Sequence, residues 1–178
     1  MSLVNIPNSI TLFRIFLVPC FALFLIYDYH HYALSAYVVA GFSDALDGIL
    51  ARKLHMQTEL GRFLDPLADK MLVVTSFIMF TAFGWIPAWL TITVLSKDLF
   101  ILTGWILLFL LFNKKAIQPT IIGKTANALQ MVLIGFVLLG RMLRVSLPGM
   151  PVLLFLTTLF TILAGLHYLY RGLKQAHD

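Results

Sequence analysis

Four aspartates stand in two close pairs in the first half of the chain. Asp44 and Asp47 are three residues apart, and Asp65 and Asp69 are four residues apart. On a helix these spacings separate the members of each pair by roughly 60° and roughly 40°. Each pair therefore faces one way, and an antiparallel packing of the two helices would bring all four carboxylates together.

Clustered carboxylates in apolar surroundings repel one another unless cations neutralise them. The ligands offered here are all oxygens, because no His or Cys lies within either pair. Mg²⁺ and Mn²⁺ are the cations that such a donor set favours. Two such ions can bridge a pyrophosphate, activating one phosphate and stabilising the departing one. The four aspartates therefore predict a site with two Mg²⁺ or Mn²⁺ ions for phosphoryl chemistry.

The residues between the two pairs fit the same chemistry. Gly48 and Ala51 are small and would let a nucleotide approach the backbone, and the Arg52 guanidinium matches phosphate oxygens. Gly61 is expected to break the chain in the turn between the pairs. The simpler alternative is that the aspartates form interfacial salt bridges with nearby Arg and Lys. Four acids at this spacing, with a Gly and an Arg between them, favour the metal site.

The composition indicates that these acids belong to a membrane protein. The chain has 178 residues, of which 60% are hydrophobic and 12% charged, and its mean hydropathy is +0.92. A soluble globule of this size needs a more polar surface, so we expect the bilayer to be the solvent. The net charge is +5, but Lys and Arg stand mostly at the ends of apolar segments, as they do near anionic headgroups. This distribution argues against a nucleic-acid partner.

Six apolar segments are long enough to cross the hydrocarbon core, which takes about 20 helical residues. They run approximately from Ile10 to Tyr27, Tyr32 to Ala51, Phe63 to Phe83, Ala88 to Phe112, Ile122 to Leu143 and Val152 to Tyr170. Most Lys and Arg residues fall on one side of these spans, whereas Arg141 and Arg144 fall on the other, and the positive-inside tendency makes the first side cytoplasmic. We therefore expect an all-α integral membrane protein with six transmembrane helices, both termini cytoplasmic, and a single domain over residues 1–178.

The acidic motif as a whole resembles the signature of the CDP-alcohol phosphatidyltransferases. The pattern D-x2-D-G-x2-A-R-x8-G-x3-D-x3-D is met by Asp44, Asp47, Gly48, Ala51, Arg52, Gly61, Asp65 and Asp69. The segment from Asn5 to Arg14 is similar to the N-terminal entry of that family. The resemblance implies a membrane enzyme that moves a phosphatidyl group from CDP-diacylglycerol to an alcohol and releases CMP.

The resemblance also implies roles for individual residues. Asp44, Asp47 and Asp65 would hold the metal pair, while Asp69 would complete it and take the proton from the acceptor hydroxyl. The residues that would contact the CDP part are Asn8, Thr11, Gly48, Arg52 and Thr58. A homodimer in a bacterial inner membrane, with the active site facing the cytoplasm, is implied as well.

The acceptor alcohol is read from other residues. The segment around Asp65 resembles the phosphatidylglycerophosphate synthase and cardiolipin synthase branches, and the fifth helix of the former commonly opens G-K-x-K-T-x-x-Q. Gly123, Lys124 and Gln130 fit that pattern, but Ala126 and Asn127 depart from it. Glycerol 3-phosphate is the leading acceptor, and phosphatidylglycerol or another alcohol is the alternative.

Lys97 and Asp98 lie inside a predicted span, where charge is costly. Lys97 and Lys124 are therefore candidates to hold an acceptor phosphate. For Lys97 the alternative is an internal pair with a neighbouring helix, and the sequence does not decide between the two.

Two other classes of function stay open. A divalent-cation channel or transporter would line its pore with the acids, but Gly48, Ala51 and Arg52 have no role in a pore. A non-catalytic scaffold would keep its function after Asp65→Ala. The leading hypothesis is phosphatidyl transfer in phospholipid biosynthesis, with direct attack by the acceptor because no Ser or Cys nucleophile is well placed.

Overall fold

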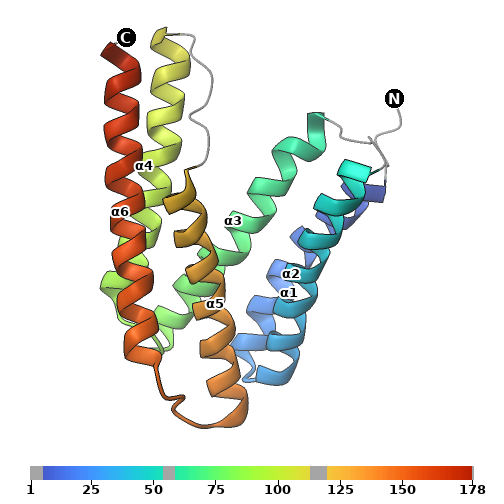
Figure 1. Cartoon of the computed structure of the whole chain (residues 1–178). Coiled ribbons are helices and arrows are strands. Elements are labelled where there is room, and N and C mark those ends of the chain that lie inside the picture. The colour runs from blue at the N-terminus through green and yellow to red at the C-terminus, as the bar shows by residue number, and fades with distance from the viewer. Residues whose placement is uncertain (1–5, 54–58, 113–119, 178) are drawn as a thin grey trace. The chain divides into compact units, whose positions relative to one another are not determined.

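A computed structural model describes the backbone of residues 6–53, 59–112 and 120–177, and the side chains of residues 11–43, 68, 70–104 and 120–172. These residues form six helices, with no strand in the described ranges (Figure 1). The helices are α1 (Ile6–Ile26), α2 (His30–Lys53), α3 (Glu59–Ala82), α4 (Ala88–Phe112), α5 (Ile121–Leu143) and α6 (Met150–His177). The all-α prediction is confirmed.

The helices follow the six predicted apolar segments closely. α4 has the predicted bounds, whereas α6 continues past Tyr170 to His177. Gly84 and Gly149 adopt φ angles of +69° and +90° in the turns before α4 and α6. Glycine reaches this left-handed region without the steric cost that other residues meet, so both turns depend on it.

One predicted turn lies elsewhere. The expectation that Gly61 breaks the chain between the acid pairs is wrong, because α3 begins at Glu59 and includes Gly61 in its first turn. The first backbone N–H groups of a helix have no partner within the helix. A glycine at this position therefore disturbs the hydrogen-bonded part of α3 very little.

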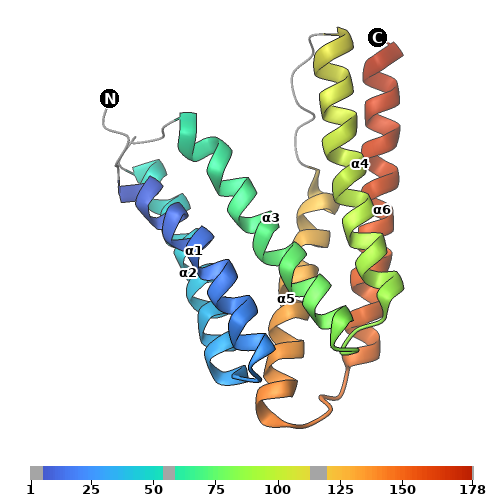
Figure 2. The same ribbon diagram turned by 180° about the vertical axis from the view of Figure 1, so that it is seen from behind.

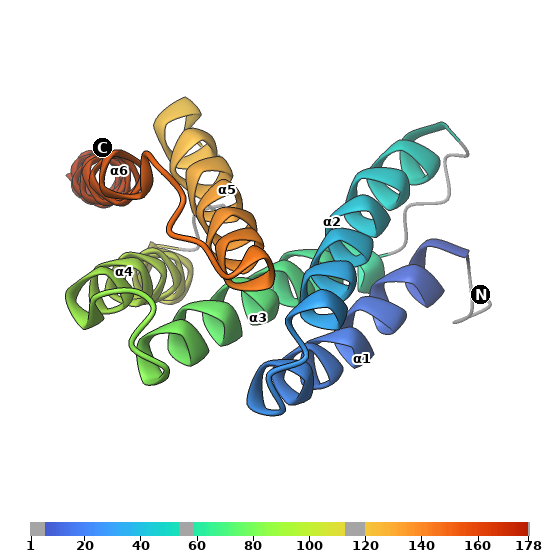
Figure 3. The same ribbon diagram turned by 90° about the horizontal axis from the view of Figure 1, so that it is seen from below.

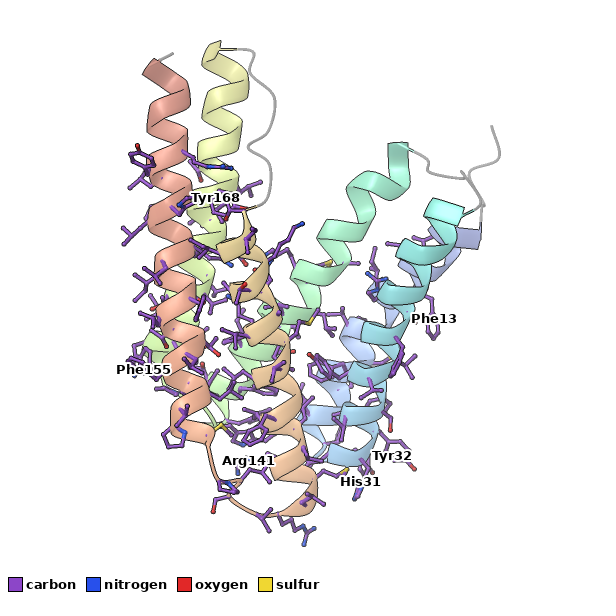
Figure 4. The ribbon with its side chains drawn as sticks, in the orientation of Figure 1. Phe13, His31, Tyr32, Arg141, Phe155 and Tyr168 are labelled. Atoms are coloured by element: carbon purple, nitrogen blue, oxygen red, sulfur yellow. The ribbon has the colours of Figure 1, made fainter. Side chains whose placement is uncertain are left out.

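Among the described residues, two helices are long and apolar enough to cross a membrane: Ile121–Leu143 and Met150–Gly172. Large apolar side chains are also exposed, among them Phe16, Phe100 and Phe155, and Phe155 points away from the neighbouring helices in Figure 4. Extensive exposed apolar surface is unusual for a soluble monomer and suits contact with lipid. The number of spans beyond these two stays a prediction.

The helices divide into two compact units. Unit 1 comprises Met1–Phe83 and Ile134–Val145, and unit 2 comprises Gly84–Leu133 and Ser146–Asp178. In unit 1, α1 packs against both α2 and α3. The described side chains on its buried stripe recur every three or four residues and are Thr11, Arg14, Val18, Phe21 and Leu25. This period is that of one helix face, so α1 turns a single stripe toward its neighbours.

The buried residues of α2 are small, and those of α3 are large. Ala33, Ala36 and Ala40 are buried on α2, and small side chains of this kind let helices approach closely in a membrane protein. Phe77 and Phe80 are buried on α3. Figure 2 shows α1 lying along α2 and beside α3.

In unit 2, α4 and α6 lie side by side (Figure 3). The start of α5 is attached to α6 by hydrogen bonds at two levels. The Thr120 N–H donates to the hydroxyl of Tyr168, which is labelled in Figure 4, at 3.3 Å. Gln130 Nε2 donates to Thr161 Oγ1 at 3.1 Å. Because Gln130 and Thr161 are fully buried, this second bond joins the two helices inside the unit.

Gly123 is required by the way Tyr168 packs on α5. A Cβ atom at Gly123 would lie 2.9 Å from Tyr168 Cε2, closer than real Cβ contacts allow. Thr120 caps the same turn, because its Oγ1 accepts a hydrogen bond from the Gly123 N–H at 3.1 Å. The glycine of this G-K pair thus has a packing reason of its own.

We predict that Gly123→Ala lowers the free energy of unfolding by about 1–3 kcal/mol, because the added methyl overpacks the contact with Tyr168. Thermal unfolding in detergent measures this. Gly135→Ala on the same helix is the matched control, since a Cβ there would lie 3.5 Å from Tyr37 Cε1, an ordinary contact. In a Tyr168→Ala background Gly123→Ala should cost much less, because only the contact with Thr120 Oγ1, at 3.2 Å, then remains tight. Equal stability of Gly123→Ala and wild type would contradict the packing.

Candidate metal and phosphate site

The two halves of the acidic motif lie at one end of unit 1. Figures 1 and 2 show that the C-terminal end of α2, the N-terminal end of α3 and the N-terminal end of α1 all point to this end of the unit. α2 includes Asp44 and Asp47, and α3 includes Asp65 and Asp69. We call this region, with the facing turns of α1, the acid end.

The four aspartates occupy the same level of the two helices. Asp44 and Asp47 stand nine and six residues before the last residue of α2, and Asp65 and Asp69 stand six and ten residues after the first residue of α3. At a rise of 1.5 Å per residue, all four lie roughly 9–15 Å from the helix ends. The two pairs therefore share one level along α2 and α3, and their meeting stays a prediction.

The acids also continue the buried faces of their helices. Positions 44 and 47 follow buried Ala40 by four and seven residues, and positions 65 and 69 precede buried Leu72 by seven and three. These intervals keep residues on one helical face. Both pairs thus fall on the faces that α2 and α3 bury within unit 1, while their side chains lie outside those that the structure describes.

α1 adds two polar residues at the same level. Thr11 is 0% and Arg14 is 1% exposed, and both belong to the stripe that packs against α2 and α3. They stand five and eight residues after the start of α1. Thr11 was predicted to contact the CDP part, and the structure places it at the acid end.

Arg14 was not predicted as a site residue. In the sequence it is the last residue of the N-terminal entry segment and one of the cations on the predicted cytoplasmic side. A signal was present, since an arginine within an apolar span is costly and marks a functional position by default. Only the structure shows that the side chain is fully buried rather than extended to the membrane surface.

The other predicted contacts to CDP are described in part or not at all. Asn8 lies in the first turn of α1, and Gly48 and Arg52 lie near the end of α2, so their backbones belong to the acid end. Their side chains, and the whole of Thr58, lie outside the described residues. Among the side chains that are described, no group of three or more His, Cys, Asp or Glu could hold a metal ion.

The two candidate acceptor lysines belong to unit 2 and differ in their surroundings. Lys97 is 5% exposed; its Nζ lies 2.9 Å from Asp98 Oδ1 and donates to Asn127 Oδ1 of α5 at 3.0 Å. Its stem packs on α6, where a Cβ at Gly165 would lie 3.6 Å from Lys97 Cγ. Lys124 is exposed on α5. The internal contact considered for Lys97 is therefore present, and a role of either lysine toward the acceptor stays a prediction.

Comparison with known proteins assigns the family. The model of the CDP-alcohol phosphatidyltransferase family matches residues 4–165. The chain is similar to the CDP-diacylglycerol–glycerol-3-phosphate 3-phosphatidyltransferase of Bacillus subtilis (strain 168), with 32% identity over 92% of this chain and 93% of the relative. The protein of the same name from Escherichia coli (strain K12) is 32% identical over 93% of each chain. A Mycobacterium tuberculosis (strain CDC 1551 / Oshkosh) protein named "Probable phosphatidylglycerophosphate synthase" is 30% identical over 96% of this chain and 83% of the relative.

These relatives are bacterial, and the match extends over nearly the whole chain. With the two helices that are apolar enough to cross a bilayer, they indicate a membrane protein. The motif that suggested the family on its own lies within the matched residues, on two helices whose acid-bearing ends lie at the same end of unit 1. The chain belongs to the CDP-alcohol phosphatidyltransferase family.

Proposed function

We propose that this protein transfers a phosphatidyl group from CDP-diacylglycerol to glycerol 3-phosphate, releasing CMP and forming phosphatidylglycerophosphate. The observation that carries the proposal is the acid end, where the two halves of the complete family motif occupy one level of α2 and α3. The names of the relatives support the acceptor, since two of them include glycerol 3-phosphate.

The donor set of the acid end fits a pair of divalent metal ions. Members of the family generally depend on a divalent metal. Asp44, Asp47, Asp65 and Asp69 offer only oxygen ligands, which Mg²⁺ and Mn²⁺ prefer, and their common level fits ligation by both helices. We assign the four aspartates to two such ions. When bound, the ions neutralise the pyrophosphate oxygens of the donor and so assist departure of CMP.

The chain's own residues then bind the donor and move one proton. Asn8, Thr11, Gly48, Arg52 and Thr58 are the proposed contacts to the CDP part. The acceptor hydroxyl oxygen bonds to the phosphorus that carries diacylglycerol, the bond from that phosphorus to the bridging oxygen breaks, and CMP leaves with the electron pair. Asp69 takes the hydroxyl proton. Attack is direct in this scheme, because the single cysteine, Cys20, lies in α1 beyond the acid end.

We further propose six membrane spans in a single domain over residues 1–178, a homodimer, and a bacterial inner membrane with both termini and the acid end in the cytoplasm. Aromatic rings at the opposite end of unit 1 support this placement. Tyr27, Tyr29 and Tyr32 are exposed at the α1–α2 turn, with ring centroids 6.4 and 6.0 Å apart in the pairs Tyr27–Tyr29 and Tyr29–Tyr32. Tyrosine is enriched at membrane interfaces, so this turn suits the interface on the other side of the bilayer.

A second candidate acceptor is phosphatidylglycerol, which would give cardiolipin. The observation that favours it is the start of α5, where Ala126 is fully buried and Asn127 contacts Lys97 at positions that hold Lys and Thr in the phosphatidylglycerophosphate synthase pattern. An acceptor with one phosphodiester charge needs fewer cations than a phosphate monoester does.

The first test uses the purified protein with CDP-diacylglycerol, Mn²⁺ and one acceptor at a time. We expect CMP release with glycerol 3-phosphate that stops when the metal is chelated, because the pyrophosphate charge is then no longer neutralised. CMP release only with phosphatidylglycerol would assign that lipid as the acceptor and leave the proposed phosphatidyl transfer unchanged. Release with neither would exclude both transfers, and metal-ion flux through proteoliposomes would then favour a transporter.

Asp69→Asn should reduce turnover by roughly 10²–10⁴-fold, because an amide cannot take the acceptor's proton. Donor binding, followed with CDP-diacylglycerol and no acceptor, should largely remain. Asp28→Asn is the matched control, since that carboxylate is exposed at the opposite end of unit 1 and should leave the rate unchanged. A rate near wild type for Asp69→Asn would remove Asp69 as the base.

Lys124→Met should raise the KM for the acceptor roughly ten-fold, the size of one charge-assisted contact. The free energy of unfolding should stay unchanged, because Lys124 is exposed. An unchanged KM in Lys124→Met would refute its role toward the acceptor.

Lys97→Met should instead lower the free energy of unfolding by about 3 kcal/mol, since it removes the ammonium beside the largely buried Asp98. The double variant Lys97→Met with Asp98→Leu should recover most of that stability.

A further inference from the structure

Arg14 is the most deeply buried cation that the structure describes. Its side chain is 1% exposed, although the residue stands only eight positions into α1. It shares its stripe with Val18, Phe21 and Leu25, so the guanidinium lies on the face that packs against α2 and α3. An arginine on a lipid-facing stripe could extend its side chain to the membrane surface, but this position does not allow it.

A buried guanidinium is stable only where negative charge compensates it. Removing a cation from water costs several kcal/mol, and good geometry with an opposite charge is needed to offset that cost. Arginine, which stays protonated at all relevant pH values, cannot avoid the cost by losing its proton. The position of Arg14 therefore implies carboxylates at the same level of unit 1.

The carboxylates at that level are those of the acidic motif. Arg14 stands eight residues from the start of α1, and the four aspartates stand six to ten residues from the ends of α2 and α3 at the same end of unit 1. The other acids in the sequence of this unit are Asp28, in the turn at the opposite end, and Glu59, the first residue of α3.

We propose that Arg14 is a positioning residue that offsets the charge of the four aspartates and holds their helices together when no metal is bound. The proposal rests on the proposed function, in that the same aspartates are taken to hold the metal ions. Two divalent ions supply more positive charge than Arg14 does, so Arg14 contributes most to the stability of the metal-free protein. The fixed cation also repels the incoming ions and thereby limits their affinity.

The test compares thermal unfolding and Mn²⁺ binding of the full chain for wild type, Arg14→Met and Arg14→Lys. In chelator, Arg14→Met should unfold roughly 6–10 °C below wild type, because the acids lose their buried cation. Saturating Mn²⁺ should close most of that gap. The Mn²⁺ affinity, measured by electron paramagnetic resonance of the free ion, should rise several-fold in Arg14→Met and stay near wild type in Arg14→Lys.

Arg144→Met is the matched control, since it removes an exposed arginine from the same unit and should change neither quantity. A gap between Arg14→Met and wild type that is the same with and without Mn²⁺ would overturn the proposal. The proposal would also be overturned if Arg14→Met were as stable as wild type without metal but had a raised KM for CDP-diacylglycerol. Arg14 would then be a contact to the donor. If wild type bound no Mn²⁺, the proposed metal site would be refuted. If wild type bound Mn²⁺ and Arg14→Met had the same Mn²⁺ affinity and thermal stability as wild type, only the role of Arg14 would be refuted.

Discussion

Repulsion among the four aspartates is the constraint on which the arrangement of unit 1 depends. Asp44, Asp47, Asp65 and Asp69 share one level of two helices, on faces that these helices bury elsewhere along their length. In low-dielectric surroundings such charges are strongly unfavourable unless cations lie among them. In the proposed function, the cations that offset this repulsion also lie where the donor's negative charge would be bound.

α1 packs against both helices that carry the acids, and the proposed role of Arg14 would add an electrostatic contribution. One stripe of this helix contacts α2 and α3, so a single element sets the position of both acid-bearing helices. Small residues on α2 allow a close approach, and Thr11 and Arg14 replace apolar side chains where the stripe reaches the level of the acids. Unit 2 is held in a different way, by hydrogen bonds between buried polar groups such as Gln130 and Thr161.

Much of this could be predicted from the sequence, because apolar length and motif spacing are local properties. The six helices followed from runs of apolar residues, and the two acid pairs followed from intervals of three and four residues. Gly61 was placed wrongly because a glycine in the first turn of a helix looks the same in sequence as one in a loop. A charge within an apolar span marks both Arg14 and Lys97 in the sequence. Which stripe of α1 faces its neighbours and how α4 meets α5 are tertiary facts, so the burial of Arg14 and the Lys97–Asn127 contact could not be predicted.

The most direct test of the account is the number of Mn²⁺ ions that the purified chain binds in the presence of CDP-diacylglycerol. Electron paramagnetic resonance can count them and detect magnetic coupling between neighbouring ions. If α2 and α3 form one metal centre, we expect two coupled ions per chain, and either Asp47→Asn on α2 or Asp65→Asn on α3 should abolish the coupling. Binding of a single uncoupled ion, or coupling that survives the loss of either aspartate, would contradict the account.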